Sequence, residues 1–559
     1  MINLMLPLMG AIARRAKSKF LQQTTQADRV QTAFLRSLLA AHQPTEFGQL
    51  HRLEEIRTLD QFRQRLPVST YQDFWPYIDR MASGEANILT PDPLVFMNMT
   101  SGSTGPKKLI PVTRRSRQAI SQANRTAMGF LFDAARREGI SLGKMLFTSS
   151  ASSMGITAGG IAYGPVSTSD LRLRNVFSRQ IFAYPFEVLQ VSDSPSRHYL
   201  CLLFALSHPH LRVISATFPV LALQLADYLE KYAESLIQDL ETGEIAPWLV
   251  LSPAQRLRLE RQWSAAPQRA RQLREIFQAE GTLTPLLAWP GLSFMVTARG
   301  GTSDFYFERF PKYFGHTPIF GGIYASAEAT YGIHRDFNTD SVLLALNSGF
   351  YEFIPEHQWE TTNPKTVLPW EVTPGDRYRI VVTNYSGFYR YDVGDVVEID
   401  GFEGNTPRFT FRHRRGGVIS STTEKTTEYH VVQTMQRLQQ EFAVQLEQFC
   451  ITLADDRIPA AYQVNIELAP GSRLDQPETF RQRFDVVLKE VNASYAVKRR
   501  DQVPDPRLRI LASGSFAALR RRMIQQGTVE SQIKFPLVTE NRTWLTGLRV
   551  EHEIRADDL

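Results

Sequence analysis

The stretch Thr100-Ser-Gly-Ser-Thr-Gly-Pro-Lys-Lys108 brings hydroxyl side chains, glycines and two lysines together within one short segment. It follows an extended apolar run and precedes an apolar-periodic one, which predicts a strand, a loop and another strand over residues 94–112. Glycines let backbone N–H groups approach an anion, while hydroxyl and lysine side chains add donors and positive charge. This composition favours a loop that holds a polyphosphate, with a solvated Ser/Gly turn as the alternative.

The spacing within this loop excludes two common nucleotide-binding motifs. A Walker A loop needs four residues between its first glycine and the Gly-Lys pair. Here only two residues separate Gly102 from Gly105, and Pro106 intervenes before Lys107. The dinucleotide pattern Gly-x-Gly-x-x-Gly is absent as well.

The composition is that of a globular protein with a large core. The chain has 559 residues, of which 43% are hydrophobic and 21% charged, and its formal net charge is +6. Basic clusters such as Arg412 to Arg415 are interpreted as solvated faces without interleaved aromatics, so we expect no nucleic-acid partner. Cys201 and Cys450 lie in apolar surroundings, which favours buried thiols in a reducing compartment and excludes a disulfide scaffold or a thiolate zinc site.

The N-terminal segment has an apolar run over residues 1–10, followed by basic residues from Arg14 onward. A signal peptide has the reverse order, and the run is too short to span a bilayer. We therefore expect an amphipathic helix that packs on the protein body, with contact to a membrane surface as the alternative. No later segment reaches transmembrane length without charge, so we expect a cytoplasmic protein without an integral membrane span.

Hydrophobic periodicity predicts a large domain at residues 1–420 and a small one at residues 421–559. The strand-rich region over residues 341–415 predicts a meander or a small barrel, and the chain after it alternates strand and helix as in a compact α+β domain. The hinge candidates are the Gly416-Gly417 pair and residues 420–425. Helical patterns cover residues 11–85, 114–138 and 218–281, and short buried strands lie within residues 292–331.

Two further segments carry single carboxylates in settings that suit a ligand. Glu328 lies among small and aromatic residues in Tyr324-Ala-Ser-Ala-Glu-Ala-Thr-Tyr-Gly332, where it can bind Mg²⁺ or act as a turn acid that caps a helix. Asp395 follows a glycine in Tyr389-Arg-Tyr-Asp-Val-Gly-Asp-Val-Val397, where it can accept both hydroxyls of a ribose or form an Asx turn. Asp392 is the weaker candidate and is expected to partner nearby arginines.

Lys534 lies in a loop of the predicted small domain, within Gly527-Thr-Val-Glu-Ser-Gln-Ile-Lys-Phe-Pro536. An isolated loop lysine is usually solvent-exposed, so its relevance depends on the other motifs. The Ser/Thr/Gly loop with lysine, Tyr-x-Ser-x-Glu, Tyr-Arg-x-x-x-Gly-Asp and this late lysine occur in an order that resembles the Gretchen-Hagen-three (auxin-responsive promoter) family of acyl acid amido synthetases. The resemblance runs nearly end to end and implies membership of the adenylate-forming superfamily.

The resemblance implies an α/β, adenylate-forming (acyl-CoA synthetase and luciferase-like) fold. Its large N-terminal domain would have mixed sheets and a small β-barrel-like part, and its small α+β C-terminal domain would be mobile. ATP and Mg²⁺ are the implied cofactors, and a small carboxylic acid and an amino acid the implied partners. The implied roles are phosphate binding by Ser101, Gly102, Ser103 and Thr104, adenine contact by Tyr324, Mg²⁺ binding by Glu328, ribose binding by Asp395, a hinge position for Lys425, and contact of Lys534 with the reacting carboxylate and α-phosphate.

The implied reaction has two halves. A carboxylate attacks the α-phosphate of ATP and releases pyrophosphate, and an amino acid amine then attacks the acyl-adenylate and releases AMP. The first half brings two anions together, so it needs the charge that Glu328-bound Mg²⁺, loop N–H groups and Lys534 would supply. The implied acyl pocket lies near residues 154–169, where Gly159 and Gly160 allow close approach and Arg125, or Arg117, could pair with a carboxylate.

Two alternatives to an amido synthetase remain open at this point. An acyl-CoA synthetase would share the first half-reaction and use a thiol acceptor, and a non-catalytic nucleotide-binding regulator would lack the chemistry. The presence of Glu328, Asp395 and Lys534 favours the enzyme. Ala329-Thr330 and Asp392 depart from the family pattern, and the sequence names neither the acid, nor the amine, nor the oligomeric state.

Overall fold

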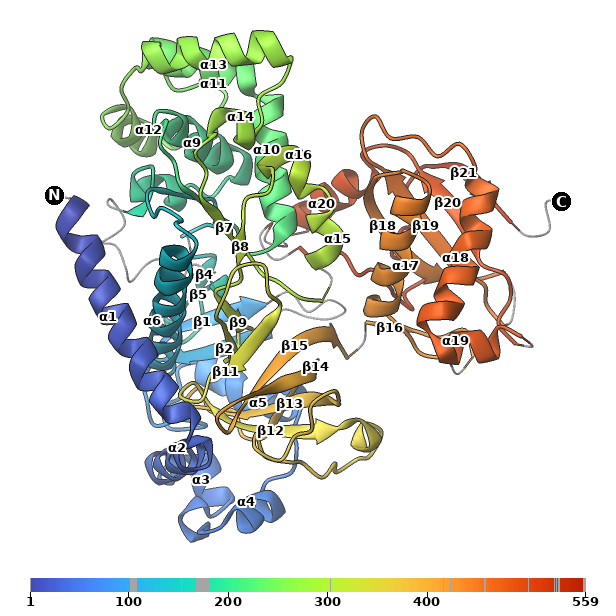
Figure 1. The fold of residues 1–559 in the computed structure, drawn as a ribbon. Helices are drawn as coiled ribbons and strands as arrows, with labels where there is room; N and C mark the ends of the chain where they lie inside the picture. Colours follow the sequence, from blue (N-terminus) through green and yellow to red (C-terminus); the bar gives the residue numbers. More distant parts are fainter. Residues whose placement is uncertain are drawn as a thin grey trace.

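The computed structural model describes residues 2–100, 108–151, 153–166, 181–301, 303–415, 417–422, 424–456, 459–500, 502–526, 528, 530 and 533–555. Figure 1 shows a large N-terminal part, coloured blue to yellow, with a smaller C-terminal part in orange and red at its side. This confirms the expected α/β fold with a large N-terminal and a smaller C-terminal domain. Among the described helices, none has the length and apolar character that a membrane span needs.

The N-terminal helix α1 (Ile2–Thr24) packs along α6 (Arg114–Arg137), as Figure 1 shows. Gly129 permits this approach, because a Cβ there would lie 2.4 Å from the carbonyl oxygen of Ala13. Phe20 meets Phe130 edge-on, with ring centroids 6.5 Å apart. The expected packing of this helix on the protein body is confirmed. Four α-helices lie between α1 and α6 in the sequence: α2 (Ala27–His42), α3 (Glu46–Leu50), α4 (Leu59–Arg65) and α5 (Tyr71–Ala82).

The first sheet has the two strands that the sequence predicts on either side of residues 101–107. β1 (Leu94–Thr100) and β2 (Lys108–Thr113) pair antiparallel, so the loop of residues 101–107 joins their adjacent ends. Thr113 ends β2 and starts α6, because its hydroxyl accepts a hydrogen bond from Ser116 N–H at 3.1 Å. The other strands of this sheet are β5 (Ala162–Gly164) and β4 (Gly155–Ile156).

A second sheet is parallel and buried, as expected for the short apolar runs within residues 292–331. Its order is β3-β6-β7-β8, for β3 (Met145–Phe147), β6 (Val213–Ser215), β7 (Phe294–Val296) and β8 (Ile319–Phe320). Parallel strands need crossover connections, and helices supply them here. The helices of this region are α9 (Ser194–Leu206), α10 (Pro219–Lys231), α11 (Ala233–Thr242), α12 (Pro253–Glu260), α13 (Pro267–Glu280), α14 (Pro285–Ala288), α15 (Ser303–Phe307) and α16 (Phe310–Phe314).

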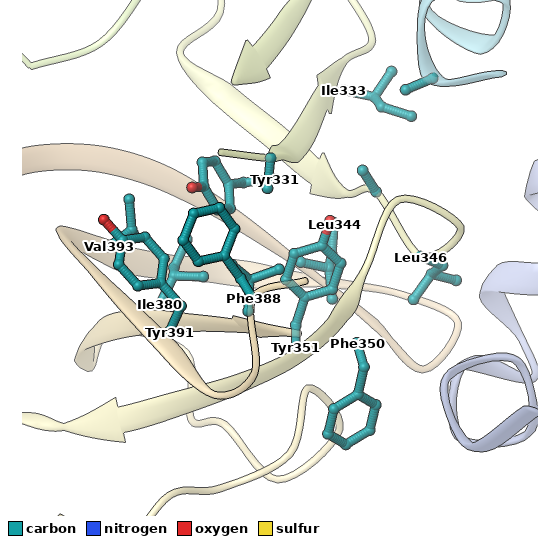
Figure 2. Packing of buried hydrophobic residues seen from close by; sticks show 14 of the residues in the cluster. Tyr331, Ile333, Leu344, Leu346, Phe350, Tyr351, Ile380, Phe388, Tyr391 and Val393 are labelled. Carbon is teal, nitrogen blue, oxygen red and sulfur yellow. The ribbon is translucent and has the colours of Figure 1, made fainter. Parts of the chain in front are cut away.

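The strand-rich region forms a seven-stranded antiparallel sheet of order β12-β13-β14-β15-β11-β10-β9. The described pairings leave β12 and β9 as its edges, so the sheet is open rather than a closed barrel. Figure 2 shows the buried residues packed on it, among them Tyr351, Phe388 and Tyr391. The strands are β9 (Ile323–Ala325), β10 (Thr330–His334), β11 (Ser341–Leu344), β12 (Phe350–Pro355), β13 (Arg377–Thr383), β14 (Tyr391–Glu403) and β15 (Thr406–Arg414).

The smaller C-terminal part is built on a four-stranded sheet of order β18-β19-β20-β21. Cys450 is buried in β18 and Cys201 in α9, so both cysteines have the packing role that the sequence predicts. The elements are α17 (Glu428–Glu441), β18 (Leu446–Leu453), β19 (Tyr462–Leu468), α18 (Pro477–Val491), α19 (Ala493–Lys498), β20 (Arg507–Leu511), α20 (Ser515–Gln525) and β21 (Val550–Ile554).

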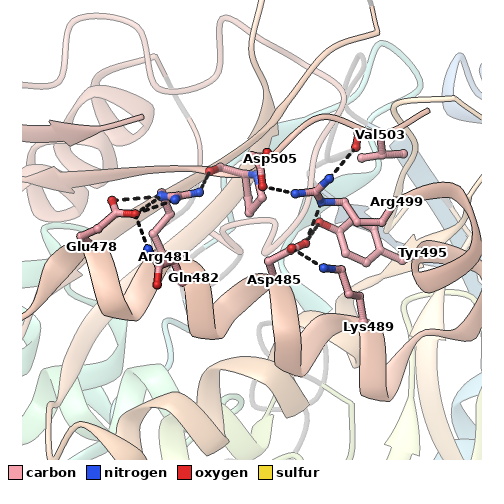
Figure 3. A network of polar contacts seen from close by, with 10 residues as sticks. Glu478, Arg481, Gln482, Asp485, Lys489, Tyr495, Arg499, Val503 and Asp505 are labelled. Carbon is pink, nitrogen blue, oxygen red and sulfur yellow. Dashed lines mark hydrogen bonds and ion pairs between the residues drawn. The ribbon is translucent and has the colours of Figure 1, made fainter. Parts of the chain in front are cut away.

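A polar network ties α18 to α19 and the chain that follows it (Figure 3). Asp485, only 7% exposed, accepts hydrogen bonds from Tyr495 Oη at 2.8 Å and from Arg499 Nε at 2.9 Å. Lys489 Nζ, one helical turn further along α18, donates to the same carboxylate at 2.5 Å. This network stabilises the small domain from within.

The segment that the sequence predicts as a hinge is a short hairpin. β16 (Val418–Ile419) pairs with β17 (Thr426–Thr427), and Glu424 between them is fully buried. The Glu424 carboxylate accepts hydrogen bonds from Thr422 Oγ1 at 2.8 Å and from Tyr462 Oη at 2.9 Å. Since Tyr462 belongs to β19, this hairpin is bound to the small domain.

Candidate active site

Asp395, a buried carboxylate in β14, is the central residue of the candidate site. Tyr324 in β9 donates its hydroxyl to Asp395 Oδ2 at 2.6 Å, and Arg414 donates Nε–H to Oδ1 at 2.7 Å. The sheet sets this geometry, because Asp395 lies directly opposite Arg414 in the β14–β15 register. Asp395 is only 4% exposed, so these two charge-assisted hydrogen bonds hold the carboxylate in one orientation.

The irregular stretch of β14 just before Asp395 is stabilised by Asp392. Gly394 has a φ of +80°, a conformation that favours glycine, and its N–H donates to Asp392 Oδ1 at 2.9 Å. The Asx interaction that the sequence leaves open for Asp395 is therefore made by Asp392. Asp392 also pairs with Arg379 at 3.3 Å, which confirms its expected arginine partner.

Tyr324 presents an aromatic surface beside the Asp395 carboxylate. Its ring centroid lies 5.3 Å from that of Tyr331 and 5.5 Å from that of Phe411. Burial, and then the charge of Asp395, raise the pKa of Tyr324 well above its ordinary value. The hydroxyl therefore stays protonated as a donor to Asp395. The half-buried Tyr324 and Phe411 rings offer a surface for a planar base, whereas the Tyr331 ring is fully buried.

Glu328 lies in the turn between β9 and β10. The helix-cap alternative is wrong, because a strand and not a helix follows this turn. Glu328 Oε2 accepts a hydrogen bond from Ser326 Oγ at 2.6 Å, and Oε1 accepts one from Tyr391 Oη at 3.1 Å. The half-buried carboxylate borders a cavity of about 20 Å³, which is large enough for a water molecule.

Hydrogen bonds tie the Glu328 turn to the strands around it. Asn98 in β1 donates Nδ2–H to the carbonyl oxygen of Ala327 at 3.3 Å, and Asn384 donates to that of Glu328 at 2.9 Å. β1 ends at Thr100, two residues beyond Asn98. The predicted phosphate-binding residues themselves lie outside the described residues: Ser101, Gly102, Ser103 and Thr104.

Lys534 reaches this region from the C-terminal domain. Its ammonium lies 4.0 Å from the ring centroid of Phe218, which precedes α10. Lys534 is an exposed residue, yet the protein atoms around its ammonium desolvate it and, together with the charge of Arg414, lower its pKa to about 8. The charges of Asp395 and Glu428 act on Lys534 in the opposite direction. Lys534 is therefore within electrostatic reach of the Asp395–Arg414 pair.

Arg414 was not among the site residues predicted from the sequence, because the basic cluster Arg412 to Arg415 was interpreted as a solvated face. A signal was present in the hairpin that joins β14 to β15. Gly404-Asn405 is a typical two-residue turn, and counting outward from Glu403 opposite Thr406 leads to Asp395 opposite Arg414.

Three family models match the chain in sequence order. The GH3 family N-terminal domain matches residues 16–319, the central domain residues 342–414, and the C-terminal domain residues 429–543. The chain belongs to the GH3 family. Asp395 and Arg414 lie within the central domain of that family and Lys534 within its C-terminal domain, so the candidate site combines two GH3 domains.

Known GH3 proteins match nearly the full length of the chain. Indole-3-acetic acid-amido synthetase GH3.6 of Arabidopsis thaliana is 26% identical, over 94% of this chain and 91% of the relative. Jasmonoyl-L-amino acid synthetase JAR4 of Nicotiana attenuata is 26% identical, over 92% and 91%.

Solved structures show the same fold. The acyl acid amido synthetase AtGH3.15 in complex with 2,4-DB has a TM-score of 0.85 at 24% identity and covers 97% of both chains. A 2-hydroxyisobutyryl-CoA ligase in the postadenylation state has a TM-score of 0.55 at 13% identity, over 92% of this chain and 90% of the ligase. The adenylate-forming fold that the resemblance implies is confirmed.

Lys425 of this GH3 chain is not part of the Asp395 group. Its exposed ammonium pairs with Glu360 Oε1 at 2.7 Å, and its neighbour Glu424 is buried in the hairpin. The predicted hinge position of Lys425 therefore stays a prediction.

The residues predicted for the acyl pocket have local packing roles in this GH3 structure. Gly159 donates its N–H to the carbonyl oxygen of Ala82 at 3.0 Å, and a Cβ there would lie 2.4 Å from the backbone nitrogen of Gly84. Gly160, with a φ of +80°, turns the chain between β4 and β5. Arg125 is exposed on α6. The close approach that the glycines permit is thus made by the end of α5, and the substrate role of these residues remains a prediction.

Proposed function

We propose that this GH3 protein is an ATP-dependent acyl acid amido synthetase, which joins a carboxylic acid to an amino acid through an acyl-adenylate. The observation that carries the proposal is that Lys534, from the C-terminal domain, lies over Phe218 within electrostatic reach of the Tyr324–Asp395–Arg414 group. Its GH3 relatives are named as amido synthetases for indole-3-acetic acid and for jasmonate. This chain would act on a related class of small acid.

In the first half-reaction, Lys534 and Arg414 would offset the charge of two anions that must meet. The substrate carboxylate forms a bond to the α-phosphorus of ATP, and the bond from that phosphorus to the pyrophosphate oxygen breaks. Preorganised cations lower the cost of this encounter, because they need no reorientation when charge develops. Arg414 is already fixed by Asp395 at 2.7 Å.

Asp395 would hold the ribose of ATP, and Tyr324 would lie against the adenine. Each oxygen of Asp395 accepts one hydrogen bond in the structure, whereas an ionised carboxylate has about four acceptor positions. The remaining positions can accept the two hydroxyls of a ribose. The Tyr324 and Phe411 rings supply the adjoining apolar surface.

Glu328 fits a Mg²⁺ ion that is also bound by substrate phosphates. Mg²⁺ usually takes one or two protein carboxylates and fills its other positions with phosphate oxygens and water. Among the described residues, Glu328 accepts one hydrogen bond at each oxygen, and no group of three or more His, Cys, Asp or Glu side chains could hold a metal by itself. A bound Mg²⁺ would neutralise phosphate charge, while Ser326 and Tyr391 orient the Glu328 carboxylate towards it.

For the second half-reaction, we propose that the small domain rotates and withdraws Lys534, which opens a path for the amine. The hairpin over residues 418–427 is bound to the small domain through Glu424 and Tyr462. The hinge of this rotation would then lie just before Val418, at the Gly416-Gly417 pair, rather than within residues 420–425. The domain boundary would move to the same place.

The test of this function is acid-dependent exchange of pyrophosphate into ATP with Mg²⁺, across benzoates, indole acids, jasmonate-like acids and fatty acids. Exchange with one acid class, followed by amide formation with an amino acid, supports the proposal. Exchange that leads to a thioester with coenzyme A but to no amide would assign an acyl-CoA synthetase. ATP binding without exchange in any acid would indicate a nucleotide-binding regulator.

A further inference from the structure

Glu530 is a buried carboxylate in the loop that carries Lys534, and the proposed function gives it no role. Its side chain is only 7% exposed, although it lies on a connecting loop of the small domain. A buried charge is costly unless a partner compensates it. The partners of Glu530 come from the large domain.

Gln224 in α10 is the principal contact. Its side-chain N–H donates to Glu530 Oε1, and Gln224 is itself only 8% exposed. The other end of the same amide accepts a hydrogen bond from Arg520 Nη1 in α20 at 3.2 Å. Gln224 thus binds two separate elements of the small domain with one side chain.

Arg197 of α9 is the cation that acts on Glu530, whereas burial lowers the pKa of the neighbouring His198 to about 4 and leaves it neutral at neutral pH. Burial raises the pKa of Glu530, and the hydrogen bond from Gln224 and the charge of Arg197 lower it. Arg197 is itself fixed, since it donates to the carbonyl oxygen of Val191 at 2.8 Å. Glu530 therefore binds the large domain as an anion.

Helix α10 connects this contact to Lys534. Phe218, which precedes the helix, lies under the Lys534 ammonium at 4.0 Å, and Gln224 follows in the second turn. The helix is firmly packed, with buried side chains at Ala222, Leu223 and Leu225. One rigid element therefore receives both Glu530 and Lys534, which fixes where the loop can lie.

We propose that Glu530 is a positioning residue: its contact with Gln224 holds the loop on α10 and keeps Lys534 at the Asp395–Arg414 pair during the first half-reaction. The inference rests on the proposed function for its chemical consequence. Withdrawal of Lys534 for the second half-reaction requires the same contact to break, so Glu530 acts in one half-reaction and not in the other.

The first experiment compares the two half-reactions in Glu530→Ala, Gln224→Ala and the double variant. Glu478→Ala is the matched control, because Glu478 pairs with Arg481 inside the small domain, as Figure 3 shows. Glu530→Ala should slow pyrophosphate exchange about tenfold, the value of a hydrogen bond to a charged group. Amide formation from a preformed acyl-adenylate should stay within about twofold of the wild-type rate in the same variant. The losses of exchange rate in the two single variants should not add in the double variant, because each substitution removes the same Glu530–Gln224 contact.

Glu530→Gln gives a readout that a merely structural role would not produce. Its amide oxygen can still accept the N–H of Gln224, so exchange should recover partly relative to Glu530→Ala. Equal loss in both half-reactions, or exchange within about twofold of wild type in Glu530→Ala, would overturn the proposal.

Hydrogen–deuterium exchange tests the loop contact without any substrate. A peptide over residues 533–538 should exchange faster in Glu530→Ala than in wild type, and should be unchanged in Glu478→Ala. Equal exchange in all three proteins overturns the positioning role even if the acid substrate is not yet found. If deuterium exchange is faster in Glu530→Ala than in wild type, but wild type catalyses no pyrophosphate exchange, the result counts against the proposed function alone.

Discussion

Asp395 and Asp485 have nearly the same surroundings in two different parts of the molecule. Each is a buried carboxylate that accepts one hydrogen bond from a tyrosine hydroxyl and one from an arginine Nε. The distances are 2.6 and 2.7 Å at Asp395, and 2.8 and 2.9 Å at Asp485. A buried Tyr–Asp–Arg arrangement is therefore no evidence of function by itself.

The two carboxylates differ in what lies next to them. Asp395 connects β9, β14 and β15 and is within electrostatic reach of Lys534 from the other domain. Asp485 binds Lys489 in its own helix, and its partners all belong to the small domain (Figure 3). A charge that comes from a second domain marks the functional site, and the predictions below test that distinction.

The largest effect is expected when Lys534 is removed. Lys534→Ala should lower acid-dependent pyrophosphate exchange by about 10²–10³, because one preorganised charge at a developing anion contributes that much. Transfer from a preformed acyl-adenylate should change far less. Lys489→Ala is the control, since it removes the corresponding cation beside Asp485, and its exchange rate per folded protein should equal that of wild type.

Replacing each aspartate separates activity from stability. Asp395→Asn should lower kcat/KM for ATP about ten- to hundredfold, since it removes an ionised acceptor from the nucleotide site. Asp485→Asn should leave that value unchanged but destabilise the small domain by about 1–3 kcal/mol.

The stability difference between the two variants has a structural cause. The Asp485 substitution removes the charged acceptor of two side chains that have little access to water. Tyr495 is fully buried, and the Arg499 side chain is 14% exposed. Arg414 is 52% exposed and can turn to water when Asp395 is lost. Thermal denaturation and steady-state kinetics on both variants measure the two effects, and a larger loss of stability in Asp395→Asn would contradict this account.

The fold could be predicted from the sequence wherever periodicity and turns act locally. The two strands predicted within residues 94–112, the long helix after them and the antiparallel meander are all confirmed. The open form of the large sheet was not predictable, because it depends on pairings between β9, β10 and distant strands.

A residue of the candidate site could be predicted only where it belongs to a recognisable sequence motif. Tyr324, Glu328, Asp395 and Lys534 carry recognisable motifs, although their partners are set by the fold. Arg414 has no motif, since only the β14–β15 register brings it opposite Asp395. The substrate role predicted for Gly159 and Gly160 stays untested, because glycine permits close packing of any kind, and the neighbour of Gly159 here is Gly84.

Glu328 should set the Mg²⁺ requirement of the first half-reaction. Glu328→Gln keeps the size of the side chain but loses the charge that a hard cation prefers. We expect the Mg²⁺ concentration for half-maximal exchange to rise at least about tenfold, a typical effect at a metal site. The maximal rate should recover in part at high Mg²⁺. Glu478→Gln should leave the Mg²⁺ requirement unchanged, and a Glu328→Gln requirement equal to wild type would remove the proposed metal role.

The pH dependence of exchange offers the finest comparison of the two aspartates. With a pKa of about 8, Lys534 is cationic below that value, so kcat/KM for ATP should fall about tenfold between pH 7 and pH 9. That parameter is the appropriate one, because it reports the free enzyme, in which no phosphate raises the pKa of Lys534. Lys534→Arg should abolish the fall, since a guanidinium stays charged throughout this range.

The position of this fall should depend on Asp395 and not on Asp485. The charge of Asp395 raises the pKa of Lys534, whereas burial and Arg414 lower it. Asp395→Asn removes the opposing charge, so the pKa of Lys534 should decrease and the fall should move to lower pH. Asp485→Asn should leave it in place, because Asp485 does not act on Lys534. A fall that moves equally in both variants, or in neither, would show that the Asp395 carboxylate is not coupled to the lysine from the other domain.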